Sequence, residues 1–392
     1  MIAANAIWLI PGLEHPVFSQ CAAVFSKLFA RFEALDYRAA YLAEGQRSLE
    51  KRIVSAMDSI DARLLIYTQF PSSYSYISPY FLASLRRRRV VVGLGWDDEM
   101  YFEQAKFFYQ SCDAVVTTDL AGAEWLKQIG IPAHAAALQL VPPARNMSAV
   151  PEDIPVSFVG DMTKPGRRKY VAHLESHGIP VKDYGKGSRN GRVSDADVLA
   201  LFFRTKINLN FTKTNPPGWV LRHDPLRGRF GQIKSRPFEL AAMGRFCLCE
   251  WLPCVEYWFD DGMTIGTFRN PGDLVHQVQR YLHDDDLRLR IAASAHKRYK
   301  SELAPEIQFE RIFSQILADS RDVATHPVSV GGILFIESMG RSRGVAFLHA
   351  LRRGSLLRAL GEILTTWSGS FSYWRGFLAG IKDALITRFR RA

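Results

Sequence analysis

The sequence Lys-Ser-Arg-Pro-Phe-Glu-Leu-Ala-Ala-Met-Gly at residues 234–244 is the most informative stretch, because it predicts an apolar helix that leads into a short buried strand. Pro237 suits the first turn of a helix, where a backbone N–H is not needed. The strand at 246–249 is wholly apolar, which is typical of a central strand in a parallel sheet. Ligands of such sheets bind beyond the carboxyl ends of the strands, and cations beside a helix N-terminus attract anions. The stretch therefore predicts an α/β fold with an anion site at this helix.

Further motifs around this stretch carry a family resemblance. Gly244 opens a Gly-Arg-Phe-Cys-Leu run, and Pro-x-x-Glu at 253–256 and Phe-x-x-Gly at 259–262 follow it. Upstream lie Val-Ser-Phe-Val-Gly at 156–160, the cations at 167 and 168, and Ile-Asn-Leu-Asn at 207–210. Together these motifs resemble the C-terminal domain of group 1 glycosyltransferases, in the branch similar to spore-maturation-type glycosyltransferases. The likeness covers about residues 154–320, whereas the first half matches in layout only.

The resemblance implies a GT-B architecture, in which two Rossmann-like domains face each other across a cleft and the second holds a nucleotide-sugar donor. The family's ribose-binding carboxylate corresponds to Glu239, and its diphosphate-binding cations correspond to Lys234 and Arg236. Many group 1 enzymes carry another glutamate eight residues earlier that holds the donor sugar, and here that position is Gly231. The donor sugar, and retention or inversion at its anomeric carbon, therefore stay open.

Other donor-side candidates lie where predicted strands end. Gly160 closes one strand, and the cationic run after it makes Arg167 a candidate for the donor diphosphate, although such a run is often a solvated helix start. Glu256 lies at the start of the helix after the 246–249 strand, where it could contact the sugar or simply favour the helix dipole. The polar loop at 212–231 is expected to border the phosphates, because long loops inside compact domains are often functional.

Acidic residues in the first half are the candidates for the acceptor side. Asp97 and Asp98, with Glu99, directly follow a predicted strand at 90–94, where a carboxylate could deprotonate an acceptor hydroxyl or bind a sugar. The alternative is that one of them caps the next helix. His15 follows the first strand and occupies a similar position, either as a substrate contact or as an incidental turn residue.

The expected chemistry is transfer of a hexosyl group to a hydroxyl, with cations and helix amides neutralising the departing nucleoside diphosphate. We expect neither a metal nor a cofactor, apart from the nucleotide sugar as co-substrate. Asp195 and Asp197 form an Asp-x-Asp pair, but Ser194 precedes them and helix capping explains them. Cys247, Cys249 and Cys254 lack accompanying histidines, so zinc is not expected.

Length and composition agree with two domains and an appendage. The chain has 392 residues, of which 47% are hydrophobic. Predicted strands lie at 6–10, 37–41, 64–68, 90–94, 114–117 and 133–137, then at 156–159, 180–184, 207–211, 246–249 and 263–268. Helices alternate with them, for example at 49–60, which carries one apolar stripe. A proline-rich break suggests an acceptor domain at 1–150, a donor domain at 151–325 and a tail at 326–392.

The cysteines and the apolar runs predict a cytoplasmic protein. Its five cysteines mostly lie inside apolar runs, as do buried thiols of a reducing compartment. The first eleven residues lack a basic region and predict a strand and not a signal peptide. A run of about 18 apolar residues, as a membrane-spanning helix requires, does not occur.

The tail is basic and rich in aromatic residues. Residues 328–392 contain ten Arg or Lys and three acids, so they contribute 10 − 3 = +7 of the chain's net charge of +11. Helices with aromatic and basic faces are typical of segments that lie on anionic membranes, which would suit a glycan or glycolipid acceptor of the cell envelope. The alternatives are a helical cap on the catalytic domains or an oligomer contact. A nucleic-acid partner is not expected, because no recognised nucleic-acid module is present.

Two rival classes share parts of this pattern. A nucleotide-sugar epimerase has the same two-domain layout and needs no acceptor. A non-catalytic sugar-binding or scaffold protein is also conceivable, because Gly231 replaces the sugar-binding glutamate.

Overall fold

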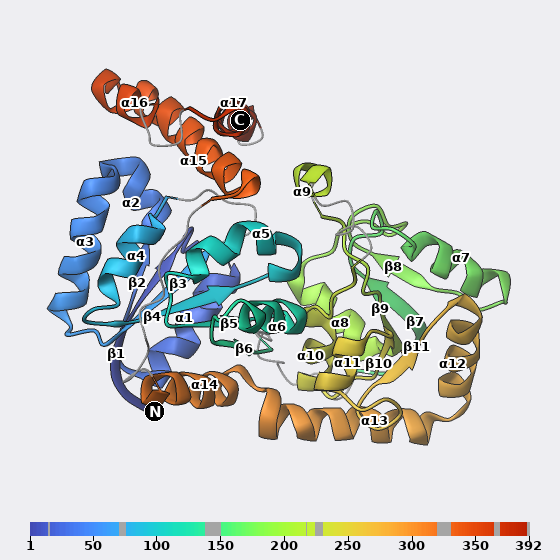
Figure 1. The fold of residues 1–392 in the computed structure, drawn as a ribbon. Coiled ribbons are helices and arrows are strands. Elements are labelled where there is room, and N and C mark those ends of the chain that lie inside the picture. The colour runs from blue at the N-terminus through green and yellow to red at the C-terminus, as the bar shows by residue number, and fades with distance from the viewer. Residues whose placement is uncertain are drawn as a thin grey trace. The chain divides into compact units, whose positions relative to one another are not determined.

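The computed structural model describes residues 1–14, 16–69, 76–137, 150–216, 218–223, 230–319, 331–363 and 369–389. The chain forms two compact units, Met1–Ala136 with Phe309–Ala392, and Ala137–Gln308. Each contains one parallel sheet covered by helices, as expected for an α/β protein (Figure 1). The chain leaves the second unit after Gln308, earlier than the boundary at 325 expected from the sequence, and its last helices belong to the first unit.

The sheet of the first unit has six parallel strands in the order β2-β1-β3-β4-β5-β6. They are β1 (Ile2–Ile10), β2 (Phe29–Asp36), β3 (Leu64–Gln69), β4 (Val90–Gly95), β5 (Ala114–Thr117) and β6 (Ala133–Ala135). Every residue of β3, β4 and β5 is buried, because helices cover both faces of the sheet.

The strand predicted at 37–41 is wrong, because this segment starts helix α2 (Tyr37–Glu44) and the edge strand β2 precedes it. Asp36 ends β2 and caps α2, its carboxylate accepting a hydrogen bond from the backbone N–H of Ala39 at 2.9 Å. Tyr37, Ala40 and Tyr41 are buried together, since residues three and four apart share one face of a helix. The two tyrosines favoured a strand by propensity, and tertiary burial overrode it.

The other helices of this unit are α1 (Pro16–Leu28), α3 (Gln46–Ser59), α4 (Pro79–Leu85), α5 (Asp98–Tyr109), α6 (Leu120–Gln128) and most of α14 (Pro305–Asp319). The predicted apolar stripe of α3 is confirmed, since Leu49, Ile53 and Met57 are buried in the core. Phe313 of α14 packs edge-on against Phe25 of α1, with ring centroids 5.7 Å apart. Aromatic packing therefore fixes the returning chain on the first unit.

The second unit has five parallel strands in the order β11-β10-β9-β7-β8, namely β7 (Ile154–Val159), β8 (Lys182–Tyr184), β9 (Thr205–Asn210), β10 (Cys247–Glu250) and β11 (Gly266–Phe268). Its helices are α7 (Arg167–Ser176), α8 (Asp195–Arg204), α9 (Gly218–His223), α10 (Ser235–Ala242), α11 (Pro253–Trp258), α12 (Pro271–His283), α13 (Asp285–Arg298) and the π-helical turn η2 (Tyr299–Leu303). Ser194 caps α8 by accepting from the backbone N–H of Asp197, as the sequence predicted for the Asp-x-Asp pair.

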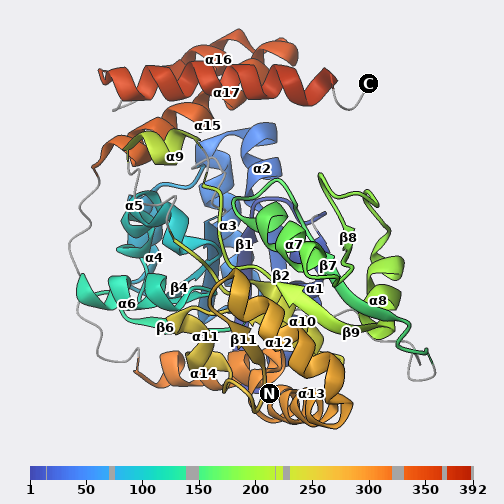
Figure 2. The ribbon, with the colours of Figure 1, turned by 90° about the vertical axis from the view of Figure 1, so that its right-hand side faces the viewer.

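The tail forms helices α15 (Ile333–Arg352), α16 (Leu356–Ile363) and α17 (Phe371–Phe389). Phe335 of α15 packs on Phe108 of α5, with centroids 5.3 Å apart, so α15 is anchored on the first unit. Helix α17 runs alongside α15, and at Gly344 an added Cβ would lie 2.0 Å from the carbonyl oxygen of Phe377. Only glycine permits so close an approach of two helix backbones, as in small-residue packing motifs (Figure 2).

The cysteines agree with the expectation of reduced thiols. All five are free, and Cys21, Cys112, Cys247 and Cys249 are buried. Burial raises the pKa of the Cys21 and Cys249 thiols to about 12, which keeps them protonated and unreactive at neutral pH. Among the helices that the structure describes, none is long and apolar enough to cross a bilayer.

Candidate functional site

Helix α10 presents the Arg236–Glu239 pair at the carboxyl end of β7. One guanidinium nitrogen of Arg236 donates to Oε2 of Glu239 at 2.8 Å, and another donates to the carbonyl oxygen of Val159 at 3.3 Å. The guanidinium also lies over the ring of Phe202, 4.2 Å from its centroid. The two side chains are 20% and 21% exposed, so the carboxylate is oriented by a fixed partner and still reaches solvent. Burial of Glu239 away from any opening would have excluded the predicted ribose contact.

Lys234 is the residue before α10. It makes no side-chain capping hydrogen bond, and it is partly exposed beside the helix N-terminus. This placement agrees with the predicted anion contact, because the backbone N–H groups of the first turn point in the same direction as the helix dipole.

The loops after β7 and β8 are held against each other at the same edge. Gly160 donates its backbone N–H to the carbonyl oxygen of Tyr184 at 2.9 Å, and Met162 donates to that of Lys186 at 2.8 Å. Gly185 has φ +113°, and a Cβ there would lie 2.2 Å from the carbonyl oxygen of Gly160. Glycine at position 185 is therefore required by the close approach of its backbone to that of Gly160.

Arg167 is a buried residue that connects two loops at this edge of the sheet. It is 7% exposed, it donates to the carbonyl oxygens of Asp161 at 3.0 Å and Phe211 at 3.3 Å, and it lies over the ring of Phe158. Burial lowers the pKa of its guanidinium, although the carboxylates of Asp161 and Glu250 raise it. Because its donors bind the loops after β7 and β9, Arg167 ranks below Arg236 as a donor contact.

Two residues at this edge were not singled out from the sequence. Lys213 follows β9 and is exposed, with its ammonium 3.9 Å from the Cβ position of Gly166, the residue before α7. Glu250 ends β10 and is buried, accepting from the backbone N–H and hydroxyl of Thr212 at 2.9 and 3.0 Å and from the Tyr170 hydroxyl at 3.1 Å. Glu250 ends a strand and Lys213 lies three residues beyond one, so the rule that ligands bind at carboxyl ends could have found them.

Glu256 lies on the exposed surface of α11. Its carboxylate accepts from the indole N–H of Trp251 at 2.7 Å and lies 4.0 Å from a guanidinium nitrogen of Arg269. Arg269 stacks on Trp251, with the guanidinium 3.8 Å from a ring centroid. This cluster follows β10 and β11, so Glu256 lies at the same carboxyl edge as predicted, with both of its partners on the surface.

A side chain at Gly231 would have to displace the end of the Leu252 side chain. A Cβ at this position would lie 2.7 Å from Cδ1 of Leu252 and 3.3 Å from Oγ1 of Thr212. The neighbouring backbone is also fixed, because Gln232 donates to the carbonyl oxygen of Thr212 at 2.8 Å. The position of the family's glutamate is therefore closely packed here, with the Leu252 side chain as its nearest neighbour. Residues 217 and 224–229 of the loop predicted to border the phosphates lie outside the described residues.

The acidic run of the first unit lies at the carboxyl end of β4, as predicted. Asp97 has φ +58° and makes no capping hydrogen bond, so it does not cap α5 as the alternative interpretation required. Asp98 and Glu99 are 2% and 4% exposed, which leaves Asp97 as the member of the run that reaches the surface. His15 lies outside the described residues.

Asp98 is a buried carboxyl group between strand ends. Its Oδ1 accepts from the Tyr109 hydroxyl at 2.8 Å, and a Cβ at Gly95 would lie 2.0 Å from Oδ2. Burial raises the pKa of Asp98 to about 6; hydrogen bonds from Thr117 and Tyr109 lower it, and the charge of Asp97 raises it. At 2% exposure its carboxyl group lies below the surface, so of the two predicted aspartates Asp97 is the more accessible, and the catalytic role of Asp98 stays a prediction.

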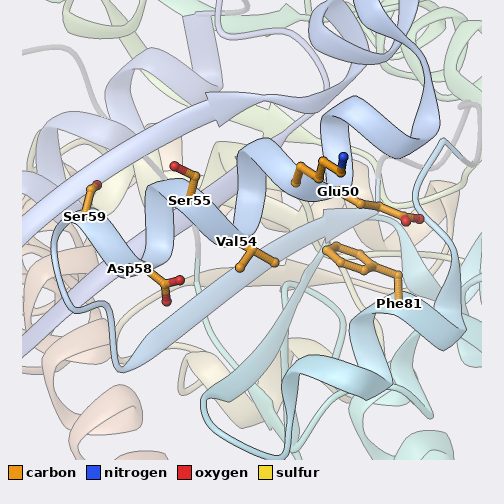
Figure 3. A pocket seen from close by; sticks show the side chains of 7 residues that line it. Glu50, Val54, Ser55, Asp58, Ser59 and Phe81 are labelled. Carbon is orange, nitrogen blue, oxygen red and sulfur yellow. The ribbon is translucent and has the colours of Figure 1, made fainter.

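A hollow along α3 contains none of the candidate residues at the carboxyl edges of the two sheets. It encloses about 800 Å³ and is open to solvent (Figure 3). Its lining comes from one face of α3 and from α4, and contains Glu50, Lys51, Val54, Ser55, Asp58, Ser59 and Phe81. Because none of the strand-end residues lines it, this hollow is not the predicted site.

Residues 158–313 match the model of a family described as glycosyl transferase-like. The second unit is therefore similar to a glycosyl transferase-like domain over most of its length. The match contains all the donor-side candidates, namely Gly160, Arg167, Lys234, Arg236, Glu239 and Glu256. A comparison with curated protein sequences gave no match.

Solved structures show that the fold is GT-B. HepE from Anabaena, crystallised with UDP and glucose, superposes with a TM-score of 0.53 at 10% identity, over 80% of this chain and 99% of that chain. Sucrose-phosphate synthase from Thermosynechococcus elongatus gives 0.52 at 11% identity, over 80% and 99% of the two chains. A glycosyltransferase from Rickettsia africae gives 0.51 at 10% identity, over 81% and 100%. At these identities the likeness concerns the fold, and the resemblance to the spore-maturation branch stays a prediction.

Proposed function

We propose that this protein transfers a hexosyl group from a nucleoside-diphosphate sugar, in particular a UDP-sugar, to a hydroxyl of an envelope glycan or glycolipid. The family match supports glycosyl transfer, and HepE, which has the same fold, was crystallised with UDP and with UDP-glucose. The proposed location is the cytoplasm, at the inner face of the cell membrane.

The Arg236–Glu239 pair carries the proposal. Glu239 is held by Arg236 at 2.8 Å and is still partly exposed at the carboxyl edge of the second sheet. A carboxylate in this position accepts two ribose hydroxyls, whereas Lys234, Arg236 and the first-turn amides of α10 favour the diphosphate. Lys213, which lies near the first turn of α7, would add a third cation for the phosphates.

The proposed reaction breaks the bond between the anomeric carbon and the diphosphate oxygen and forms a bond from that carbon to the acceptor oxygen. The acceptor proton passes to a carboxylate, for which the partly exposed Asp97 is the candidate. Negative charge grows on the departing nucleoside diphosphate, and fixed cations stabilise it without a metal ion. The proposed roles therefore involve only residues that lie at the carboxyl edge of one sheet or the other.

Calorimetric titration and thermal shift with UDP, GDP and their glucose and mannose conjugates test donor binding. Glu239→Gln removes the charge but keeps the shape, and we expect its Kd for the preferred ligand to rise about tenfold to a hundredfold. Glu302→Gln is the matched control, because Glu302 also pairs with an arginine one turn earlier but lies 60% exposed on η2. Equal affinities in the wild type and Glu239→Gln would refute the ribose contact.

Turnover separates this proposal from its rivals. Release of UDP that depends on an added acceptor supports transfer. Conversion of the donor without an acceptor indicates an epimerase, and tight binding with no turnover over many acceptors indicates a sugar-binding scaffold, which the packed Gly231 would explain.

A further inference from the structure

Large apolar side chains are exposed in one part of the molecule more than elsewhere. Of the twenty that are exposed among the described residues, eight lie on the two helices α16 and α17. These are Leu356, Leu357, Leu360, Phe371, Trp374, Leu378, Leu385 and Ile386. Scattered single residues of this kind are normal on a surface, but eight on two helices that both pack on α15 are a concentration that needs a reason.

Helix α16 has its leucines outside and its acid inside. Leu356, Leu357 and Leu360 are 63%, 87% and 46% exposed, whereas Glu362 is 5% exposed. Glu362 accepts from Arg343 of α15 at 2.8 Å and from the hydroxyl of Tyr41 of α2 at 2.8 Å. The buried ion pair fixes the rotation of α16, so the leucines are held outward by specific polar contacts.

Helix α17 shows the same division. One side of the helix faces α15 and carries Tyr373, Gly376, Phe377 and Gly380. Tyr373 on this side is fully buried. Phe371, Trp374 and Leu378 follow each other at intervals of three and four residues, which places them on the other side of the helix. Both helices pack on α15, and Figures 1 and 2 show them as the helices of this unit that lie farthest from its sheet.

The acidic side chains of the tail all form ion pairs with arginines of the tail itself. Each of the three acids pairs with a tail arginine: Asp383 with Arg341 at 2.7 Å, Glu362 with Arg343, and Glu337 with Arg375. The remaining cations carry the net charge of +7, and of these Arg352, Arg353 and Lys382 are exposed. The side chains of Arg388, Arg390 and Arg391 lie outside the described residues.

We propose that the outward faces of α16 and α17 form a docking surface for an anionic lipid bilayer. Exposed leucine and aromatic side chains insert among the lipid chains near the headgroups, while exposed cations meet the lipid phosphates. The internal pairing of all three tail acids favours this occupant, because it leaves positive charge beside the apolar face. This inference deepens the proposed location at the membrane, but it does not depend on sugar transfer.

Co-sedimentation of the full chain with vesicles tests the surface. We expect binding to vesicles of phosphatidylcholine with phosphatidylglycerol, weaker binding to phosphatidylcholine alone, and loss of the difference at high salt. The triple variant Leu356→Gln, Leu357→Gln, Leu360→Gln should lower the partition coefficient at least about tenfold. The matched control replaces three exposed apolar residues outside the tail, Ile129, Met263 and Leu289, by Gln, and it should bind as the wild type does.

Two further readouts distinguish a membrane-docking surface from an oligomer contact and from a defective donor site. Calorimetric binding of UDP-sugars without vesicles should be unchanged in the triple variant, so failure of the docking surface and failure of the donor site give different results. Vesicle binding that the triple variant retains would overturn the proposal. So would light scattering that shows a dimer dispersed by these substitutions, together with no vesicle binding by the wild type, because the face would then be an oligomer contact.

Discussion

Asp98 gives the sharpest prediction, because its carboxyl group lies in the interior and titrates in an accessible pH range. The group is 2% exposed and is hydrogen-bonded to the Tyr109 hydroxyl. Its pKa rises from 3.8 to about 6, mainly because burial disfavours the charged form. Asp98→Asn keeps the size of the side chain and an acceptor oxygen for the Tyr109 hydroxyl, but it removes the group that titrates.

The magnitude follows from the difference between the folded and unfolded states. A shift from 3.8 to about 6 corresponds to roughly 3 kcal/mol. The folded state holds the Asp98 proton more tightly than the unfolded state does, so protonation of Asp98 stabilises the fold. This stabilisation is fully present below pH 3.8 and is lost as the pH rises through about 6. At pH 5 about 1.4 kcal/mol should remain, and at pH 7.5 almost none.

Urea unfolding of the wild type and Asp98→Asn at several values between pH 5 and pH 7.5 measures this effect. The difference in free energy of unfolding between the two proteins cancels the titration of all other groups. We expect Asp98→Asn to gain about 1.4 kcal/mol relative to the wild type over this range. A difference that stays constant with pH would refute the raised pKa, and loss of sugar transfer in a well-folded Asp98→Asn would show that the carboxyl group also serves catalysis.

Two more predictions concern backbone approach and the buried pair of the tail. Gly185→Ala should lower the free energy of unfolding by about 1–3 kcal/mol, because its Cβ would meet the carbonyl oxygen of Gly160 at 2.2 Å. Gly178→Ala, where φ is +74° but no atom lies within 4 Å, should cost less in the same urea unfolding experiment. Glu362→Ala leaves the Arg343 guanidinium buried without its carboxylate and should destabilise the tail by about 3–5 kcal/mol. Hydrogen exchange on α16 measures that loss, and unchanged protection there would contradict the role of the pair.

The elements whose signals are local could be predicted from the sequence. The apolar run at 90–94, the stripe of α3 and the capping of α8 by Ser194 each depend on neighbours within a few residues, and all three are confirmed. The α10 stretch likewise places Arg236 and Glu239 one helical turn apart, close enough to pair. The family motifs, which are also local, located the donor-side candidates.

The contacts that each side chain makes depend on parts of the chain that meet only on folding. Arg167 resembles a ligand cation in the sequence, but its donors bind two loops, from positions 161 and 211, that only the folded sheet brings together. The segment at 37–41 became a helix because burial overrode strand propensity. Helix α16 turns its leucines outward because Glu362 finds partners on α15 and α2, the latter some 320 positions away in the chain. Such contacts join residues that are distant in sequence, so no local pattern encodes them.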